Sequence, residues 1–222
     1  MNKIFNRHLL VLSSIICHLS FSMMLASCST DAYDKGDGKY SLLRADMVEI
    51  FTNGEGMVER VVTDEDYTLR TKPFSIKGMQ VPDTLYRAYL YYNMNDDEDD
   101  PVSIGRVSTL VPYPFDTLKT DPVNFESAWE STSHRYLNMS LLLKTGTSSG
   151  DDYHSIGIHL DTLMTHTDGK RTAHLQFYHD QGGLPEYYSQ RIYISIPTDS
   201  LAADTVCLRI NTYDGVVEKR FP

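Results

Sequence analysis

The stretch TLYRAYLYYN at residues 84–93 decides the fold class of this chain. Arg87, Tyr89 and Tyr91 alternate with Tyr86 and Tyr92, so the two sets point to opposite faces of an extended segment. Aromatic side chains are also common on pleated, half-buried surfaces. The stretch therefore predicts a β-strand.

Short runs of the same kind surround this strand from residue 40 to residue 118. Strands are expected at 45–51, 57–62, 67–70, 84–93 and 102–111, with turns at 53–56 and 64–66. About five short strands in such a length are typical of a small barrel of the OB type. Pro112, Pro114 and Pro122 then disfavour a central strand, which puts the domain boundary near residues 116–124, with the barrel at 40–118.

The second region, residues 119–222, also alternates with a period of two. Strands are expected at 134–144, 153–163, 172–179, 190–196 and 206–210, and a last strand ends at Phe221. In the 190–196 run, Arg191, Tyr193 and Ser195 point away from the core. Six strands with tight turns predict an antiparallel β-sandwich, so the fold class is all-β.

One hairpin of this sandwich has a predictable register. Asp168-Gly169 is typical of a tight turn. A turn centred on these two residues pairs Leu160 with Phe177, and it places Tyr178 opposite His159.

The first 27 residues have the pattern of a secretory signal peptide. Lys3 and Arg7 precede an apolar stretch that ends in Leu25, Ala26, Ser27 and Cys28. This ending resembles the bacterial lipobox, which implies cleavage before Cys28 and acylation of its thiol. The alternative is a plain transmembrane anchor, but the stretch is short and interrupted by serines.

Residues 28–39 are polar and rich in glycine, which predicts a tether between the lipid and the fold. We therefore expect a lipoprotein of the cell envelope, held on the outer membrane by acyl chains on Cys28, on its periplasmic or its surface-exposed face.

Charge and cysteine content exclude several classes of function. Without Lys3 and Arg7, 18 basic residues remain against 30 acidic ones, so the formal net charge changes from −10 to −12. This balance argues against nucleic-acid binding, which requires cations that neutralise phosphates. Cys17 leaves with the signal and Cys28 carries lipid, so Cys207 alone remains, and neither a disulfide nor a zinc site with paired cysteines is expected.

The order of the parts resembles the NigD-like lipoproteins of Bacteroidales. The resemblance rests on the lipobox, on Trp129 and the following 136–138, and on the segments 174–179, 182–183 and 187–196. It implies a lipid-anchored OB-like domain followed by a β-sandwich. The name of the family comes from a bacteriocin locus, which implies a role in self-protection; the resemblance supplies no catalytic residue.

Gly146-Thr147-Ser148-Ser149-Gly150 matches the G-x-S-x-G motif of hydrolases. In those enzymes the serine lies between a strand and a helix, whereas here it lies between two expected strands, which favours a loop. We expect no enzymatic activity and no cofactor, and an envelope hydrolase that uses Ser148 is the least favoured alternative.

Two clusters of polar residues could bind metals. Six histidines lie between His134 and His179, but none has the i, i+4 spacing of helical ligands. The acidic run 96–100 lacks the spaced ligands of an EF-hand, so we expect a solvated hairpin loop, with weak surface calcium binding as the alternative. No metal site is therefore predicted.

Four tyrosines, Tyr86, Tyr89, Tyr91 and Tyr92, form the candidate ligand face. OB folds bind ligands on aromatic faces, but tyrosine is also common in sheets because it packs well, and packing is the favoured interpretation. The expected function is that of a non-enzymatic envelope protein that binds an unidentified protein or glycan. The alternative is an immunity lipoprotein that protects against a bacteriocin.

Overall fold

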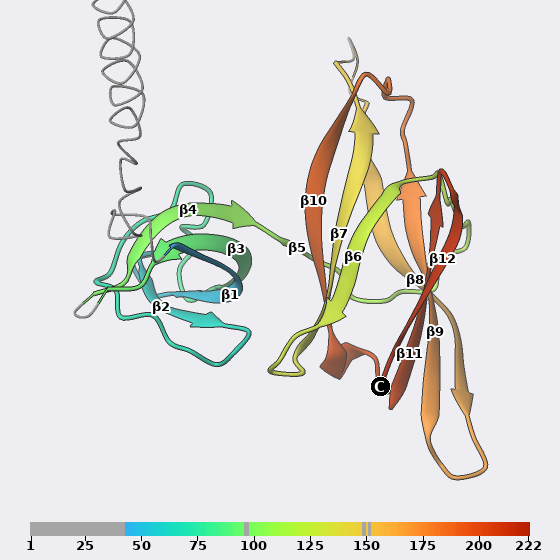
Figure 1. Ribbon diagram of the computed structural model, residues 1–222, viewed down its shortest axis with the longest axis horizontal. Helices are drawn as coiled ribbons and strands as arrows, with labels where there is room; N and C mark the ends of the chain where they lie inside the picture. Colours follow the sequence, from blue (N-terminus) through green and yellow to red (C-terminus); the bar gives the residue numbers. More distant parts are fainter. Residues whose placement is uncertain (1–42, 96–97, 148–149, 151) are drawn as a thin grey trace, which may run out of the picture. The chain divides into compact units, whose positions relative to one another are not determined.

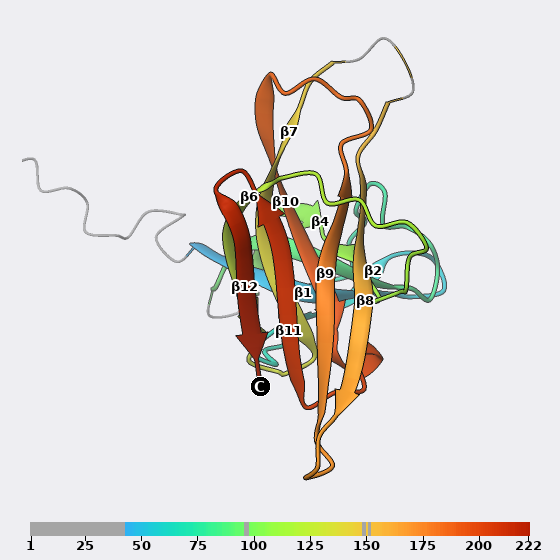
Figure 2. The same ribbon diagram turned by 90° about the vertical axis from the view of Figure 1, so that its right-hand side faces the viewer.

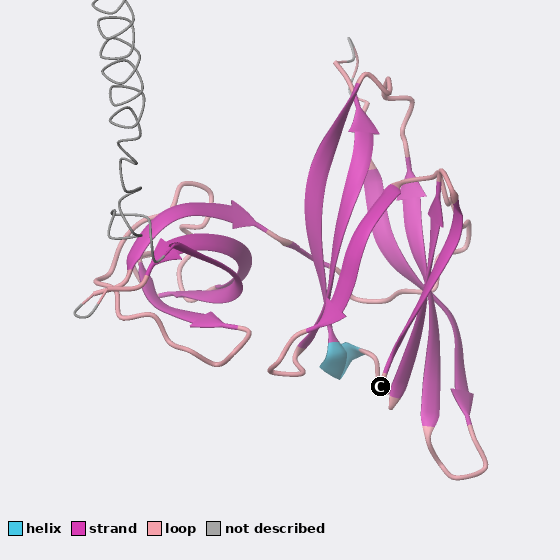
Figure 3. Ribbon diagram, in the orientation of Figure 1, coloured by secondary structure: helices cyan, strands magenta, loops and turns pink. Residues whose placement is uncertain are grey.

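A computed structural model describes residues 43–95, 98–147, 150 and 152–222 of the chain. Over these ranges the chain forms twelve strands in three four-stranded sheets, with one short 3₁₀ helix, η1 (Thr198–Ser200) (Figures 1 and 3). The predicted all-β class is therefore confirmed. No helix in the described part of the chain is long and apolar enough to cross a membrane.

The first sheet is antiparallel and has the order β2-β1-β3-β4. Its strands are β1 (Leu43–Thr52), β2 (Val58–Thr63), β3 (Leu85–Asn93) and β4 (Asp100–Arg106). The sheet curves strongly in Figure 1, and its concave face encloses an apolar core that includes Val48, Ile50, Ala88 and Leu90. Alternation along β3 causes this arrangement, since every second residue points into that core.

The edges of this sheet meet through an irregular segment. Single bridges join Val62 to Thr68 and Val58 to Phe74, and the backbone N–H of Asp99 donates to the carbonyl of Arg70 (2.9 Å). The expected strand at 67–70 is therefore only a bridge, and no pairing between β2 and β4 occurs among the described residues. A barrel of the OB type is not confirmed.

Two further sheets form the β-sandwich. One has the order β5-β10-β7-β6, with β5 (Ser108–Thr109), β6 (Asn124–Glu130), β7 (Tyr136–Thr145) and β10 (Tyr188–Pro197). The other, seen in Figure 2, has the order β12-β11-β9-β8, with β8 (Ser155–Thr165), β9 (Arg171–Asp180), β11 (Thr205–Thr212) and β12 (Gly215–Phe221). The predicted sandwich was purely antiparallel, but β10 pairs with β5, and β9 with β11, in parallel.

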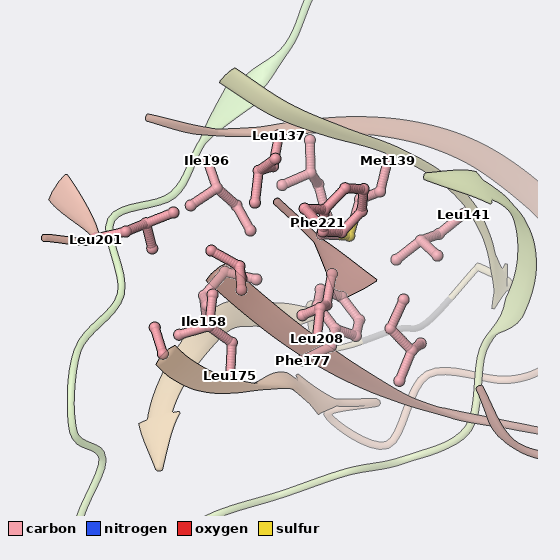
Figure 4. Packing of buried hydrophobic residues seen from close by; sticks show 14 of the residues in the cluster. Leu137, Met139, Leu141, Ile158, Leu175, Phe177, Ile196, Leu201, Leu208 and Phe221 are labelled. Atoms are coloured by element: carbon pink, nitrogen blue, oxygen red, sulfur yellow. The ribbon is translucent and has the colours of Figure 1, made fainter. Parts of the chain in front are cut away.

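The two sheets of the sandwich bury a common core (Figure 4). Met139, Leu141 and Ile196 of one sheet lie opposite Phe177 and Leu208 of the other. All five side chains are almost completely buried. Each contributes about 1.5–3 kcal/mol through removal of its apolar surface from water.

The sandwich begins earlier than residue 119. Strand β5 at Ser108–Thr109 already pairs with β10, so the expected strand at 102–111 divides between two sheets. Strand β6 was not predicted from the sequence. A bulge between Phe125 and Ser127 interrupts its alternation, which hides it from a pattern with a period of two.

The predicted register of the β8–β9 hairpin was wrong by two residues. Leu160 pairs with Leu175 rather than with Phe177, and His159 pairs with Gln176 rather than with Tyr178. The backbone N–H of His166 donates to the carbonyl of Lys170, so the loop holds three residues and shifts the register by one. A bulge after Leu160 shifts the register by one more residue. Because the total shift is even, the core faces of both strands are preserved.

Candidate functional site

A cleft of about 470 Å³ lies between the first sheet and the outer face of the β6-β7-β10 sheet. Strands β1 and β3 contribute Asp46, Met47 and Tyr89, and the turn after β2 contributes Asp64 and Glu65. The opposite wall comes from β6, β7, β10 and the β6–β7 turn, with Glu126, Ser127, Trp129, Glu130, Ser131, Thr132, Ser140, Arg191 and Tyr193. Volumes of this size are typical of ligand sites.

Aromatic rings line part of this cleft. Tyr89 stacks on Tyr193, with ring centroids 4.6 Å apart, and Tyr91 contacts Tyr89 edge-on at 5.2 Å. Burial raises the pKa of Tyr89 to about 12, with the neighbouring Tyr91 as the next cause, so its hydroxyl stays protonated. Trp129, the single tryptophan of the chain, is half-buried in the wall. Such rings can stack on planar or cationic groups of a ligand.

The charges of the lining are mostly negative. Among the described residues of the lining, five side chains are carboxylates and Arg191 is the only basic one. Arg191 binds Glu126 through Nε and Nη2, each at 2.6 Å, and the hydroxyl of Ser140 donates to Glu126 at 2.6 Å. The hydrogen bond from Arg191, followed by that from Ser140, lowers the pKa of Glu126, so this carboxylate is ionised at neutral pH.

A buried polar network joins the walls beneath the cleft. Arg87 projects from β3, and its side chain is 2% exposed. It donates to Asp64 (2.6 Å), Ser195 (3.1 Å) and Asn138 (3.2 Å). Ser195 and Asn138 belong to β10 and β7 and are themselves bonded at 2.7 Å. These hydrogen bonds join β3 of the first sheet to β7 and β10 of the sandwich.

Tyr136 extends the network on the side of β7. The guanidinium of Arg87 lies 4.0 Å above the centre of its ring, and its hydroxyl donates to Glu49 at 2.8 Å. Burial raises the pKa of Tyr136 to about 12, with the hydrogen bond to Glu49 as the second cause. Arg135 adds an exposed ion pair with Asp66 at 2.6 Å.

The four tyrosines of the predicted ligand face lie in two different places. Tyr86 and Tyr92 are buried in the core of the first sheet, where the Tyr92 hydroxyl donates to Asp46 at 2.8 Å. Tyr89 lines the cleft, and Tyr91, which is 40% exposed, lies beside it. Packing accounts for the first pair, whereas the second pair can contact a ligand.

Two of the six histidines form a pair at the end of the second sandwich sheet. His179 is fully buried, and its Nδ1 donates to the carbonyl of Asp121 at 2.9 Å. Its Nε2 therefore accepts the proton of His154 Nδ1 at 3.0 Å, and His154 Nε2 is buried without a partner among the described residues. Burial, and next the neighbouring His179, lower the pKa of His154.

The lowered pKa of His154 makes the stability of the fold sensitive to acid. A histidine whose folded pKa is lowered binds fewer protons when folded, so we expect stability to fall as the pH drops below the unfolded value of about 6.5. His154→Gln removes this contribution. Urea unfolding at neutral and mildly acidic pH is expected to show a smaller loss for His154→Gln than for the wild type. Equal losses would contradict the assignment.

Within residues 43–95, 98–147, 150 and 152–222, no three or more His, Cys, Asp or Glu side chains gather in a group that could hold a metal. Cys207 is free and half-buried in β11. Leu25, Ala26, Ser27, Cys28 and Ser148 lie outside the described residues.

The acidic run after β3 is not wholly solvated. Asp96 and Asp97 lie outside the described residues, but the side chain of Asp99 is completely buried. Burial opposes ionisation of Asp99, yet hydrogen bonds from the Arg70 N–H and the Tyr67 hydroxyl outweigh it and lower the pKa. Asp99 therefore links the start of β4 to the segment that follows β2.

The sequence did not predict that Arg87, Asn138 and Ser195 form one hydrogen-bonded network. Ser195 was expected on the outer face of its strand, and it is on that face, but it is completely buried there by the first sheet. A single polar residue on the outer face of a strand does not indicate that another sheet will cover it. The usable signal was Arg87, because a cation in the middle of an aromatic strand needs a partner.

The comparisons with known proteins agree with this architecture. The family model of the NigD-like C-terminal beta sandwich domain matches residues 108–221. A NigD-like immunity protein from Bacteroides caccae is 27% identical, with a TM-score of 0.63 over 79% of this chain and 91% of that one. No match was found among curated proteins.

Two further solved structures share the fold at lower identity. A putative toxin related protein from Parabacteroides distasonis is 17% identical, with a TM-score of 0.61 over 81% of this chain and 92% of that one. A putative lipoprotein from Bacteroides fragilis is 10% identical, with a TM-score of 0.51 over 81% and 96% of the two chains.

Proposed function

The chain belongs to the family defined by the NigD-like C-terminal beta sandwich domain, and from this premise we propose that it is a lipid-anchored, non-enzymatic binding protein of the cell envelope. One observation carries the proposal. The cleft combines aromatic rings, carboxylates and an edge strand between two walls that a buried network holds together. Preformed, partly apolar clefts of this kind suit binding.

Anchoring is the first part of the proposal. Cys28 follows Leu25, Ala26 and Ser27, and acyl chains on its thiol would hold the protein on the outer membrane. We expect the intact mass of the membrane-extracted protein to match cleavage before Cys28 plus acyl chains. In Cys28→Ala the acylated species and the membrane attachment should both be lost. An uncleaved, unacylated wild-type chain would contradict anchoring.

Binding at the cleft can be tested without knowledge of the ligand. A photoreactive residue at Thr132, on the rim of the cleft, is expected to form adducts in intact cell envelopes. The same residue at Thr167, which is exposed in the β8–β9 turn, provides the matched control. Adducts at Thr132 that disappear in Trp129→Ala support the proposal. Equal labelling at both positions, or labelling that survives Trp129→Ala, would contradict it.

Bacteriocin immunity is the second candidate function, and the NigD-like immunity protein from Bacteroides caccae favours it. In that case the cleft would bind a toxin or its membrane target. Cells without the gene would then be killed more readily by a toxin encoded beside it, and the wild-type chain would restore survival. A neighbourhood without toxin and transporter genes would count against this role.

A further inference from the structure

The charge of the cleft indicates the class of its ligand. Its lining holds five carboxylates, those of Asp46, Asp64, Glu65, Glu126 and Glu130, and one basic group. Asp64 is already paired with Arg87 at 2.6 Å, so four carboxylates remain against Arg191 for a ligand to meet.

Arg191 shows which cationic group the lining accepts. Its guanidinium is bidentate to Glu126, and its strand neighbour Tyr193 stacks on Tyr89. The side chain of Arg191 is 53% exposed, so solvent reaches the guanidinium although it is paired with Glu126. Exposed ion pairs contribute only about 0–1 kcal/mol, so a cation from outside could compete with Arg191 for Glu126.

The edge of the sheet points to an extended chain rather than a small molecule. Strand β6 is the last strand in the order β5-β10-β7-β6, and its residues Glu126, Ser127, Trp129 and Glu130 line the cleft. An edge strand presents backbone N–H and C=O groups that a peptide can pair with.

We infer that the cleft binds an extended peptide segment of a partner protein, and that an arginine or lysine of this segment pairs with Glu126 beside Tyr193 and Trp129. The inference rests on the proposed binding function and adds the chemical class of the ligand. Arg191 acts as an internal competitor for the same carboxylate. A neutral sugar could donate hydroxyl hydrogens to these carboxylates, but it brings neither a positive charge nor a backbone that can pair with the edge strand β6, so we favour the peptide over the glycan.

The experiment uses the intrinsic fluorescence of Trp129, which reports on the cleft alone because the chain has no other tryptophan. The full mature protein in detergent is titrated with three tryptophan-free peptides of equal length: one rich in arginine, one in which glutamine replaces arginine, and one in which glutamate does. We expect saturable binding of the arginine peptide, weakened by added salt, and at least tenfold weaker binding of the other two.

Two variants test the residues. Glu126→Gln should weaken binding of the arginine peptide about five- to tenfold, since the hydrogen bond to its arginine then has an uncharged acceptor. Arg191→Gln removes the competitor and should strengthen binding by a similar factor. Glu218→Gln, which alters an exposed ion pair with Arg209 in the other sheet, is the control and should change nothing.

Each outcome decides one point. Equal binding of the glutamine or glutamate peptide overturns selection of a cation, and so does Arg191→Gln that weakens binding. No saturable change of fluorescence with any peptide overturns the peptide class. Neither result contradicts the proposed binding function, which cross-linking at Thr132 tests separately.

Discussion

Replacing Arg87 with methionine is expected to lower the free energy of unfolding by about 3–5 kcal/mol, because the carboxylate of Asp64, whose side chain is only 13% exposed, then lies opposite an apolar side chain. Asn138 and Ser195 each lose a donor at the same time. Buried hydrogen-bonding groups without partners are costly. Urea unfolding followed by circular dichroism measures the difference.

The control for this prediction is Arg209→Met. Arg209 also lies in a strand and pairs with Glu218 at 3.0 Å, but its side chain is 55% exposed. Such pairs contribute about 0–1 kcal/mol. In addition, Asp64→Asn combined with Arg87→Met should cost less than the sum of the two single changes, because both members of the pair are then uncharged. Equal effects of Arg87→Met and Arg209→Met would contradict the network.

Gly182→Ala is expected to cost about 2–5 kcal/mol, for two reasons that add. Gly182 has a φ of +65°, which strains any residue with a Cβ atom. The new methyl group would also meet the backbone carbonyl of Tyr153, which cannot move as a flexible side chain can. The loss is measured as the shift of the urea midpoint.

Gly169→Ala separates the two reasons. Gly169 has a φ of +84°, but a Cβ atom there would meet nothing within 4 Å. This variant should therefore cost only the backbone strain, about 1–2 kcal/mol. If both alanine variants lost the same stability, close packing against Tyr153 would be ruled out as a cause.

Much of the fold was predictable from alternation along the chain. Strands β1, β2, β3, β7, β9 and β11 lie close to the expected ranges, because each has one face in a core and the other outside it. Alternation gives the faces of a strand but not its partner. The parallel pairing of β9 with β11 therefore had no local signal, since β10 lies between them in the chain and joins the other sheet.

The candidate site was only partly predictable, for a related reason. The four tyrosines of β3 were predicted only as one candidate face, with packing favoured, whereas Trp129, Glu126 and Arg191 reach the cleft from strands far away in the sequence. The bulge in β6 also hides the face on which Trp129 lies. Long-range pairing therefore decides which side chains meet, and no single segment carries that information.

The distance along the chain between Arg87 and Ser195 bears on the order of folding. These residues are 108 positions apart, so during synthesis and during the proposed export the first sheet emerges long before the groups that complete its outer face. Closing so long a loop is slow compared with local pairing. During this delay, an apolar face would attract other unfinished chains. Arg87, Glu49 and Tyr89 make this face of the first sheet polar, so we expect the partly folded chain to expose less apolar surface to other chains before the sandwich forms.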